Sequence, residues 1–418
     1  MVTASQRVIL VIVMFSIFSD AYAQFFDRRS RPDPELTYFI YPVAGSIPGV
    51  QDFYGLASTV SGIEQSEVDI SLASLKGEAK YFDNNDFGIN FITILDIPLF
   101  TPRLTFSLFY TNITNGTWPE GERGINSDPD KTYYLLGSKI YGSGGELSLN
   151  ISDYQFEFYL GFVNSGVKPY GMVDPNGDFY SVERANINEN PTGYRYGIYL
   201  DDTDHRRDPR IGYRFHWERY DMPNTRGENS SYYQDDFNIT GYIPLRENNN
   251  GILVLNQFIG TSNVRKKGTI NRDNYKCNEN LRPGCQTIID VLYKRQVIEA
   301  EHGKATSLGG TQRLRGYRQN RFFDSYTNFR GIEYRWYLYE VQKAFNFLIE
   351  RGTFAGFQAA LFYEEGTVSP DMGSSFWKNF KNSYGLGARF LFNSVIIRID
   401  KGISEEGSET TFFIGYGF

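Results

Sequence analysis

The chain has 418 residues, a net charge of −7 and a pI near 5.3, and 17% of its residues are aromatic. The acidic balance argues against nucleic acid as the main partner, because a polyanion binds basic surfaces. The mean hydropathy of −0.41 argues against a bundle of transmembrane helices, each of which needs about 20 consecutive apolar residues. A chain with 41% hydrophobic residues and 41 glycines is not disordered, and with so many aromatic residues it is typical of an all-β protein.

One long apolar run lies near the N-terminus. It covers Val8–Phe18, follows Arg7, and precedes the small-x-small cleavage site Ala21-Tyr22-Ala23. The run is too short to span a membrane as a helix and is followed by polar residues, so it predicts a secretory signal over residues 1–23. We therefore expect an exported protein whose mature chain begins at Gln24.

The two cysteines, Cys277 and Cys285, lie in the segment NYKCNENLRPGCQ. In an oxidising compartment they predict one local disulfide, and the alternative is a pair of reduced thiols. Such a small ring constrains the unfolded chain by about 2–3 kcal/mol in the entropic model. No histidine lies close to the two thiols in the sequence, so a metal site is not expected there.

The disulfide has a direct test. We expect the purified protein to have a mass two hydrogens below that of the reduced form, because one S–S bond replaces two S–H bonds. We also expect that a maleimide labels intact cells at Cys277 or Cys285 only after a reductant is added. Labelling without reductant would show two reduced thiols instead.

Alternating apolar and polar residues recur along the chain in runs of about ten, each followed by a Gly, Asn or Asp turn. In Tyr154–Phe162 the even-numbered residues are apolar, and in Val395–Lys401 the apolar Val395, Ile397 and Ile399 alternate with Ile396, Arg398 and Asp400. At the C-terminus, Phe412, Ile414, Tyr416 and Phe418 alternate with Phe413, Gly415 and Gly417. This period of two indicates strands with one apolar face and one polar or small face.

Long strands, tall aromatic faces and long polar connections favour a transmembrane antiparallel β-barrel over a soluble sandwich, which also gives alternation. A closed barrel satisfies every backbone polar group in the bilayer. The sequence holds sixteen or seventeen candidate strands, and because single-chain bacterial barrels prefer an even number we expect 16 strands. We expect residues 24–52 to form a short periplasmic segment and residues 53–418 to form the barrel domain.

The C-terminal residues carry a second signal. The chain ends in Phe418, with Tyr416 two residues earlier. This spacing resembles the C-terminal signal by which outer-membrane barrels are recognised during assembly. It agrees with the predicted secretory signal and with the strand pattern.

The most specific motifs lie between residues 308 and 366. They are, in chain order, Leu308-Gly309-Gly310, Leu314-Arg315-Gly316-Tyr317, Gly331-x-Glu333-x-Arg335 and Phe362-Tyr363-Glu364-Glu365-Gly366. These motifs resemble the BamA/TamA superfamily of outer-membrane assembly barrels, also called the bacterial surface antigen family. The five strands expected after the second motif, beginning near residues 326, 352, 383, 395 and 410, agree with that family as well.

The resemblance implies a role for each motif. Leu314-Arg315-Gly316-Tyr317 would be the tip of a long extracellular loop that folds back into the lumen. The tip Arg315 would pair with the acid of a Phe-x-Asp-x-Gly motif, in which Glu364 takes the place of the Asp. Family members commonly carry periplasmic polypeptide-transport-associated repeats before the barrel. Fewer than 30 residues separate Gln24 from the first expected strand near Phe53, so we expect a barrel-only member with a separate periplasmic partner.

Residue parity points to the same pairing without the resemblance. In Phe354–Glu364 the odd-numbered residues form an apolar face, which places Glu364 on the opposite, lumenal face. In Phe329–Leu338 the same argument places Glu333 and Arg335 inside. An arginine carried inward on a loop would meet two carboxylates there, and guanidinium suits bidentate pairing. The alternative is that these charges line a solvated lumen, as in any porin.

The sequence contains no G-x-S-x-G, H-E-x-x-H or phosphate-binding glycine loop, so we expect no catalytic residue, metal or cofactor. Asp201–His205 has the residue types of an outer-membrane protease or a calcium site, but a solvated turn is the simpler interpretation. The resemblance implies a protein of the bacterial outer membrane that inserts or translocates protein or lipid. Its partners would be membrane lipids and client outer-membrane proteins or lipids. The alternative function is a passive pore or structural barrel.

Overall fold

The computed structural model describes residues 36–47, 51–63, 68–79, 82, 86–152, 155–181, 192–205, 208–222, 231–246, 250–270, 272, 285–347, 350–392, 396–414 and 416–417. The predicted signal over residues 1–23 lies outside these ranges, and so do Cys277 and Phe418. No helix in the described part of the chain has the length and apolar character needed to cross a bilayer.

The described residues form 17 strands, one α-helix and two short 3₁₀ helices. In chain order they are β1 (Thr37–Ile47), β2 (Gln51–Ser61), β3 (Asp69–Glu78), β4 (Asp86–Pro98), β5 (Leu104–Glu120), η3 (Pro129–Lys131), β6 (Tyr133–Ile151), β7 (Phe156–Val173), β8 (Phe179–Ser181), β9 (Thr192–Thr203), β10 (Gly212–Met222), β11 (Ser231–Pro244), β12 (Gly251–Lys266), α2 (Cys285–His302), β13 (Tyr326–Phe347), β14 (Glu350–Ser369), η6 (Ser374–Trp377), β15 (Lys381–Phe392), β16 (Ile396–Ser404) and β17 (Gly407–Ile414).

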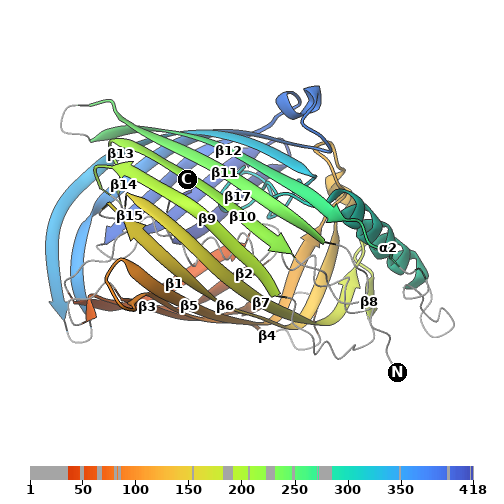
Figure 1. Ribbon diagram of the computed structural model, residues 1–418, viewed down its shortest axis with the longest axis horizontal. Coiled ribbons are helices and arrows are strands. Elements are labelled where there is room, and N and C mark those ends of the chain that lie inside the picture. Colours follow the sequence, from red (N-terminus) through yellow and green to blue (C-terminus); the bar gives the residue numbers. More distant parts are fainter. Residues whose placement is uncertain are drawn as a thin grey trace.

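The strands form one antiparallel sheet that closes into a barrel, with α2 projecting at one end (Figure 1). Each strand pairs with its neighbours in sequence, except that β7 pairs with both β8 and β9. The sequence predicted 16 strands from residue 53 onward, whereas two of the described strands were not predicted: β1, which lies before that boundary, and the three-residue β8, which is too short for a period of two to reveal. The predicted all-β antiparallel barrel is therefore confirmed at the level of architecture.

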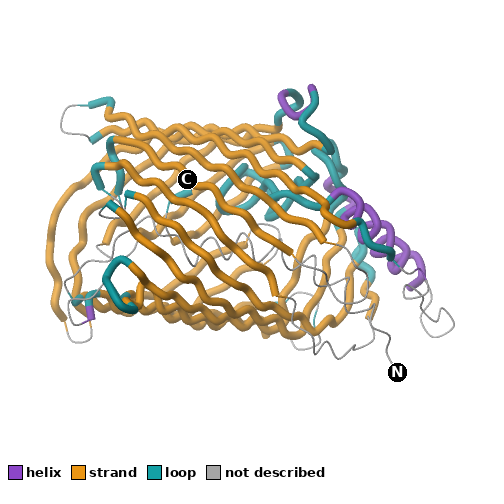
Figure 2. Tube along the Cα trace, viewed as in Figure 1, coloured by secondary structure: helices purple, strands orange, loops and turns teal. Residues whose placement is uncertain are grey.

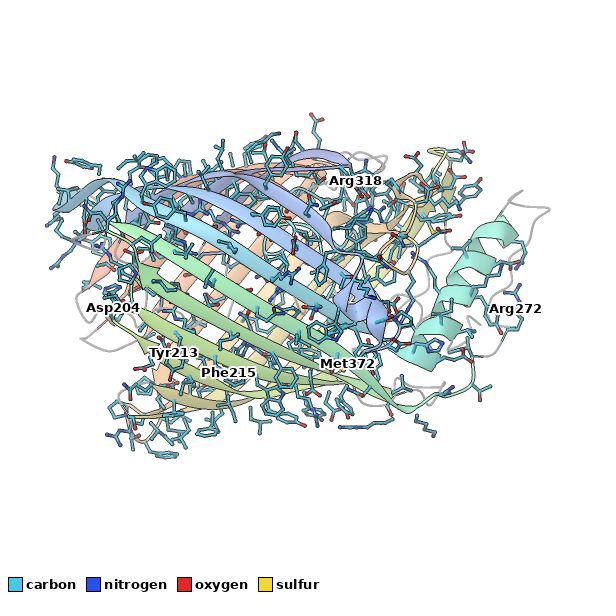
Figure 3. The ribbon with its side chains drawn as sticks, turned by 90° about the horizontal axis from the view of Figure 1, so that it is seen from above. Asp204, Tyr213, Phe215, Arg272, Arg318 and Met372 are labelled. Carbon is cyan, nitrogen blue, oxygen red and sulfur yellow. The ribbon has the colours of Figure 1, made fainter. Side chains whose placement is uncertain are left out.

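An apolar surface covers the outside of the sheet. On β7 the predicted apolar face is exposed, with Leu160 58% exposed, while Glu157 and Tyr159 on the other face are 6% exposed. Tyr213 and Phe215 of β10 lie on this outer side in the view from above (Figure 3). Exposed apolar side chains on other strands extend the same surface around the barrel: Tyr54, Leu56, Leu108, Tyr110, Phe237, Ile239, Ile332, Leu361, Tyr363, Leu386 and Ile399.

The sheet begins earlier than the sequence predicted. The predicted boundary at residue 53 is wrong, because β1 covers Thr37–Ile47 and pairs with β2 along its whole length. The sequence hides this strand because Pro42 and Ala44-Gly45-Ser46 interrupt the alternation. Proline is tolerated at the edge of a sheet, where its missing N–H breaks no ladder. In the structure β1 is the strand at which the barrel closes.

The closure joins opposite faces of the first and last strands. Residues directly paired across strands share a face, and Tyr41 of β1 is paired with Ala57, both on the buried lumenal side. On β17, Phe412 is paired with Ile399, which is 40% exposed on the outer side. Tyr41 and Ala57 nevertheless pack in one apolar cluster with Phe412 and Ile397. The outer face of the last strands therefore lies against the lumenal face of the first strands.

The two strands approach closely at this overlap. A Cβ built on Gly45 of β1 would lie 2.9 Å from the Cβ of Phe412, so no larger residue fits there without a shift. β1 also pairs with β14 at one described position, where Tyr38 lies opposite Arg351. We name this contact between β1 and β17 the overlap seam. Side-chain packing is its main described contact, unlike the hydrogen-bonded ladders between other neighbouring strands.

Candidate functional site in the barrel lumen

The segment 303–325 connects α2 to β13 and carries the Leu-Arg-Gly-Tyr motif. Its two arms are held together by a bridge in which Leu308 and Phe322 exchange backbone hydrogen bonds of 2.8 and 3.0 Å. Gly309 has a φ of +102°, and a Cβ there would meet the carbonyl oxygen of Arg318 at 2.2 Å, so glycine is required for this turn. At the far end, the N–H of Tyr317 donates to the carbonyl of Leu314 and closes the tip.

An apolar layer inside the barrel supports this segment. Leu308, Leu314 and Tyr317 are almost fully buried and pack on inward-facing residues of β11 to β14, namely Tyr242, Ile252, Val254, Phe258, Phe329 and Val368. Gly366 of β14 makes room for them, because a Cβ there would lie 2.6 Å from the Cδ1 of Leu308. The loop segments lie within the outline of the barrel toward the end that carries α2 (Figure 2).

Arg315 at the tip is fully buried among three carboxylates. Its Nε lies 2.7 Å from Glu364 Oε1, its Nη2 lies 2.9 Å from Glu333 Oε2, and its Nη1 lies 2.7 Å from Asp400 Oδ2. Its backbone N–H also donates to Glu364 Oε2 at 2.7 Å, and its guanidinium lies 3.6 Å from the centre of the Phe362 ring. All four charged side chains are 0% exposed, so solvent does not screen these pairs.

Three further arginines complete the arrangement. Arg389 contacts Glu333 at 3.1 Å and Asp400 at 2.7 Å, so Arg315 and Arg389 alternate with these two acids in a closed ring. Arg335 lies 2.6 Å from Glu333, and Arg398 lies 3.3 Å from Asp400. We name the seven residues the lumenal charge cluster: Arg315, Glu333, Arg335, Glu364, Arg389, Arg398 and Asp400. The partners of Arg315 come from β13, β14 and β16, and Arg389 of β15 joins the cluster through Glu333 and Asp400.

The backbone of the tip also lies directly against β16. A Cβ on Gly402 would lie 2.4 Å from the carbonyl oxygen of Arg315, and a Cβ on Gly316 would lie 2.7 Å from the carbonyl carbon of Ile403. Ser404 donates a hydrogen bond of 2.8 Å to the carbonyl of Gly316. The tip is therefore positioned by close packing as well as by charge.

Among the residues that the sequence singled out, the structure brings together Arg315, Glu364, Glu333 and Arg335, with Phe362 beside them. Gly366 lies against Leu308 and Leu314 of the loop instead. Sequence reasoning missed Arg389, Arg398 and Asp400 as partners. The inward parity of Arg398 and Asp400 was visible in the alternation of Val395–Lys401, but parity does not show how far along the barrel the tip reaches.

Tyr416 does not lie on the outer apolar face that the alternation predicted. β17 ends at Ile414, and Tyr416 is 2% exposed inside the barrel. Its hydroxyl donates to Asp208 and to Gln358 Oε1, and the guanidinium of Arg335 lies 3.9 Å from the centre of its ring. The predicted orientation is wrong because the period of two holds only while the strand continues. The proposed assembly signal also involves Phe418, which lies outside the described residues.

In the alternative site at Asp201–His205, the side chains of Asp201 and His205 form contacts with neighbouring residues of the chain. Asp201 Oδ2 lies 3.1 Å from Arg214 Nε, and Asp201 Oδ1 accepts from the hydroxyl of Thr203 at 2.6 Å. His205 Nδ1 accepts the backbone N–H of Asp208 at 3.1 Å. Within the described ranges, no three His, Cys, Asp or Glu side chains are grouped so that they could hold a metal ion.

No protein-family model matches the chain, and no curated protein matches it in sequence. Among solved structures, CdiB from Escherichia coli is similar with a TM-score of 0.53 at 10% identity, over 91% of this chain and 62% of that one. CdiB from Acinetobacter baumannii gives a TM-score of 0.49 at 12% identity, over 91% and 60%. BamA from Haemophilus ducreyi lacking POTRA domains 1-3 gives 0.48 at 14% identity, over 91% and 69%. The chain thus spans about three fifths of the CdiB chains, and at these identities its likeness to the Escherichia coli CdiB shows a shared barrel fold.

Proposed function

We propose that this protein is an outer-membrane β-barrel that inserts or translocates protein or lipid, as its resemblance to the BamA/TamA superfamily implies. The apolar outer surface supports a place in a bilayer, because it exposes leucine, isoleucine and aromatic side chains on strand after strand. The predicted signal and the barrel architecture support the outer membrane. Client outer-membrane proteins or lipids and a separate periplasmic protein would be its partners.

The main support for insertion activity is the overlap seam between β1 and β17. A continuous ladder of backbone hydrogen bonds resists opening, whereas a seam held mainly by the packing of side chains such as Tyr41 and Phe412 opens without breaking such a ladder. Opening would expose the backbone edges of β1 and β17. An exposed strand edge pairs readily with an incoming strand, which is the step that an insertion machine needs. A passive pore gains nothing from a weak seam.

The lumenal charge cluster supports the same function. Arg315 and Arg389 together join β13, β14, β15 and β16, so these four strands resist separation. Motion is then concentrated between β17 and β1. The passive pore stays the alternative, because a seated loop could equally restrict diffusion through the lumen.

A disulfide across the seam tests the proposal. Gly45→Cys with Phe412→Cys places the two Cβ atoms about 1 Å closer than in an ordinary disulfide, and removal of the Phe412 ring provides the space to adjust. We expect oxidised protein to lose its ability to complement a deletion strain, and reductant to restore it. Both cysteines are introduced after Cys277 and Cys285 have been replaced by serine.

The matched control is Ala388→Cys with Ile399→Cys, a register pair inside the β15–β16 ladder. We expect this lock to leave complementation unchanged. We also expect backbone amides of β1 and β17 to exchange with solvent faster than those of β15 and β16. Equal exchange at both places, with a locked seam that still complements, would leave the passive pore as the better interpretation.

A further inference from the structure

A cavity of about 460 Å³ lies beside α2 and is lined by none of the residues of the lumenal charge cluster. Three segments that are far apart in the sequence line it: the chain from the end of β5 to the start of β6, the part of α2 from Val291 to Glu299, and the loop 303–325. Its size falls within the range of small-molecule sites in proteins, which is about 300–1,000 Å³. The described partners of Arg315, namely Glu333, Phe362, Glu364 and Asp400, are not among its lining residues.

Two arginines hold the walls of the cavity in place. Arg295 of α2 donates to Glu120 Oε2 at 2.7 Å and also to the carbonyl of Gly121. Arg123 donates to Asp324 Oδ1 at 2.6 Å and to the carbonyl of Gly303 at 2.8 Å. Because charged hydrogen bonds connect all three segments, the cavity is formed before any ligand arrives, which lowers the entropic cost of binding.

The lining has more positive than negative side chains. The positively charged residues are Arg123, Lys131, Lys294, Arg295 and Lys304, and the negatively charged ones are Glu120, Glu122 and Glu299. Beyond the two wall arginines, Lys304 is 6% exposed, and Lys294 is an exposed residue of the lining. Lys131 is 3.6 Å from Glu122, with both side chains more than half exposed, so this pair is weak.

Aromatic and apolar surface completes the lining. Tyr133 and Phe323 contribute rings, and the Nζ of Lys304 lies 4.4 Å from the centre of the Phe323 ring. A bare polyanion would be repelled by the three carboxylates, and a purely apolar ligand would offer no hydrogen-bonding group to the charged side chains of the lining. An anionic sugar matches this lining in three ways. Its hydroxyl groups donate hydrogen bonds to the carboxylates, its anionic group accepts them from the ammonium groups, and the carbon face of its ring packs on the aromatic rings.

We propose that this cavity binds an anionic saccharide. Lys304 and Lys294 contact the anionic group, Glu120 and Glu122 accept hydrogen bonds from hydroxyl groups, and Tyr133 and Phe323 pack against the sugar ring. The ligand comes either from the headgroup of a glycolipid in the surrounding membrane or from a saccharide in solution. This proposal is independent of the function at the overlap seam.

Glu299 makes this binding depend on pH. The pKa of its carboxyl is raised to about 7, because burial and the nearby Glu120 raise it by more than Lys304, Arg123 and Arg295 lower it. Tyr232 is its hydrogen-bond partner. Below pH 7 the protonated Glu299 adds no negative charge to the cavity, so an anion binds more tightly. Above pH 7 the ionised form repels the anion and weakens binding.

The test uses the full chain in detergent micelles and isothermal titration calorimetry. We expect glucose 6-phosphate to bind, and glucose and inorganic phosphate each to bind at least about tenfold more weakly, because each lacks one half of the recognised chemistry. Lys304→Gln should weaken binding of glucose 6-phosphate about tenfold. Lys378→Gln, an exposed lysine on the β14–β15 connection, is the matched control and should not change it. Inorganic phosphate binding as tightly as the sugar phosphate, tetraglutamate binding more tightly, or no binding at all would overturn the proposal.

The pH arm uses glucose 6-sulfate, whose charge is constant between pH 6 and 8. We expect affinity to be about threefold higher at pH 6 than at pH 8, and to become independent of pH in Glu299→Gln. A pH dependence that survives this substitution would contradict the role of Glu299.

Flotation with vesicles then distinguishes the two sources of the ligand. Purified protein in micelles is mixed with vesicles of phosphatidylcholine that contain a phosphorylated glycolipid or phosphatidylglycerol. Preferential binding to the glycolipid vesicles, lost in Lys304→Gln, indicates a lipid headgroup. Binding of glucose 6-phosphate without any preference for the glycolipid indicates a saccharide in solution.

Discussion

Arg315→Ala is expected to lower the free energy of unfolding of the barrel by about 3–5 kcal/mol, because it leaves buried carboxylates without their shared cation. Glu333, Glu364 and Asp400 all contact this guanidinium at 2.7–2.9 Å, and all are 0% exposed. The remaining arginines contact Glu333 and Asp400 but have no described contact with Glu364. The folded barrel should therefore lose its compact migration on semi-native gels at a clearly lower temperature.

Arg330→Ala is the matched control for this change. Arg330 pairs with Glu365, the residue after Glu364, at 2.6 Å, but its side chain is 55% exposed. An exposed pair contributes about 1 kcal/mol or less, so the melting temperature should hardly change. The double variant Arg315→Ala with Glu364→Ala should be less destabilised than the sum of the two single variants, because it removes both partners together. Identical melting of wild type, both single variants and the double variant would refute the pairing.

Gly402→Val is expected to displace the loop 303–325 from the lumen without removing any charge. Its Cβ would lie 2.4 Å from the carbonyl oxygen of Arg315 and 2.6 Å from the N of Gly316, both backbone atoms that cannot rotate away. Overpacking of this kind costs about 1–3 kcal/mol, and the contacts of Arg315 would be lost in addition. Limited proteolysis should cut the loop in the variant while the strands stay protected.

Gly241→Val in β11 is the control for the added side chain. A Cβ at Gly241 meets nothing within 4 Å, and valine is favoured in strands. This variant should keep the loop protected from protease and keep the stability of the wild type. A Gly402→Val protein whose loop stays protected would show that the tip does not lie against β16 in solution.

The alternation of inward-facing and outward-facing residues along each strand predicted much of the site. The period of two is a local property of the strand, and it needs only neighbouring residues. It placed Glu333, Arg335 and Glu364 on one face, and these three side chains are 0% exposed inside the barrel. The same argument predicted the exposed face that contains Ile332 and Leu361.

The long-range features could not be derived in this way. Which acids surround Arg315 depends on the depth at which the loop sits, and that depth is set by the packing of Leu308 and Leu314 on distant strands. The overlap seam depends on how residues 37–47 meet residues 407–414, more than 350 residues later. The inward position of Tyr416 depends on its contact with Asp208 in the turn between β9 and β10, which no local pattern encodes.

The position of Arg315 in the chain has a consequence for the order of folding. Arg315 is synthesised before β13, β14, β15 and β16, yet its partners lie on β13, β14 and β16, and Arg389 of β15 contacts two of them. Its binding place exists only once all four strands are paired in register, since a slip of one residue would turn Glu364 or Asp400 to the outer surface. Seating of the loop is then a late event that reports correct pairing of this part of the wall, and a barrel with a misregistered strand would keep its loop outside, accessible to proteases.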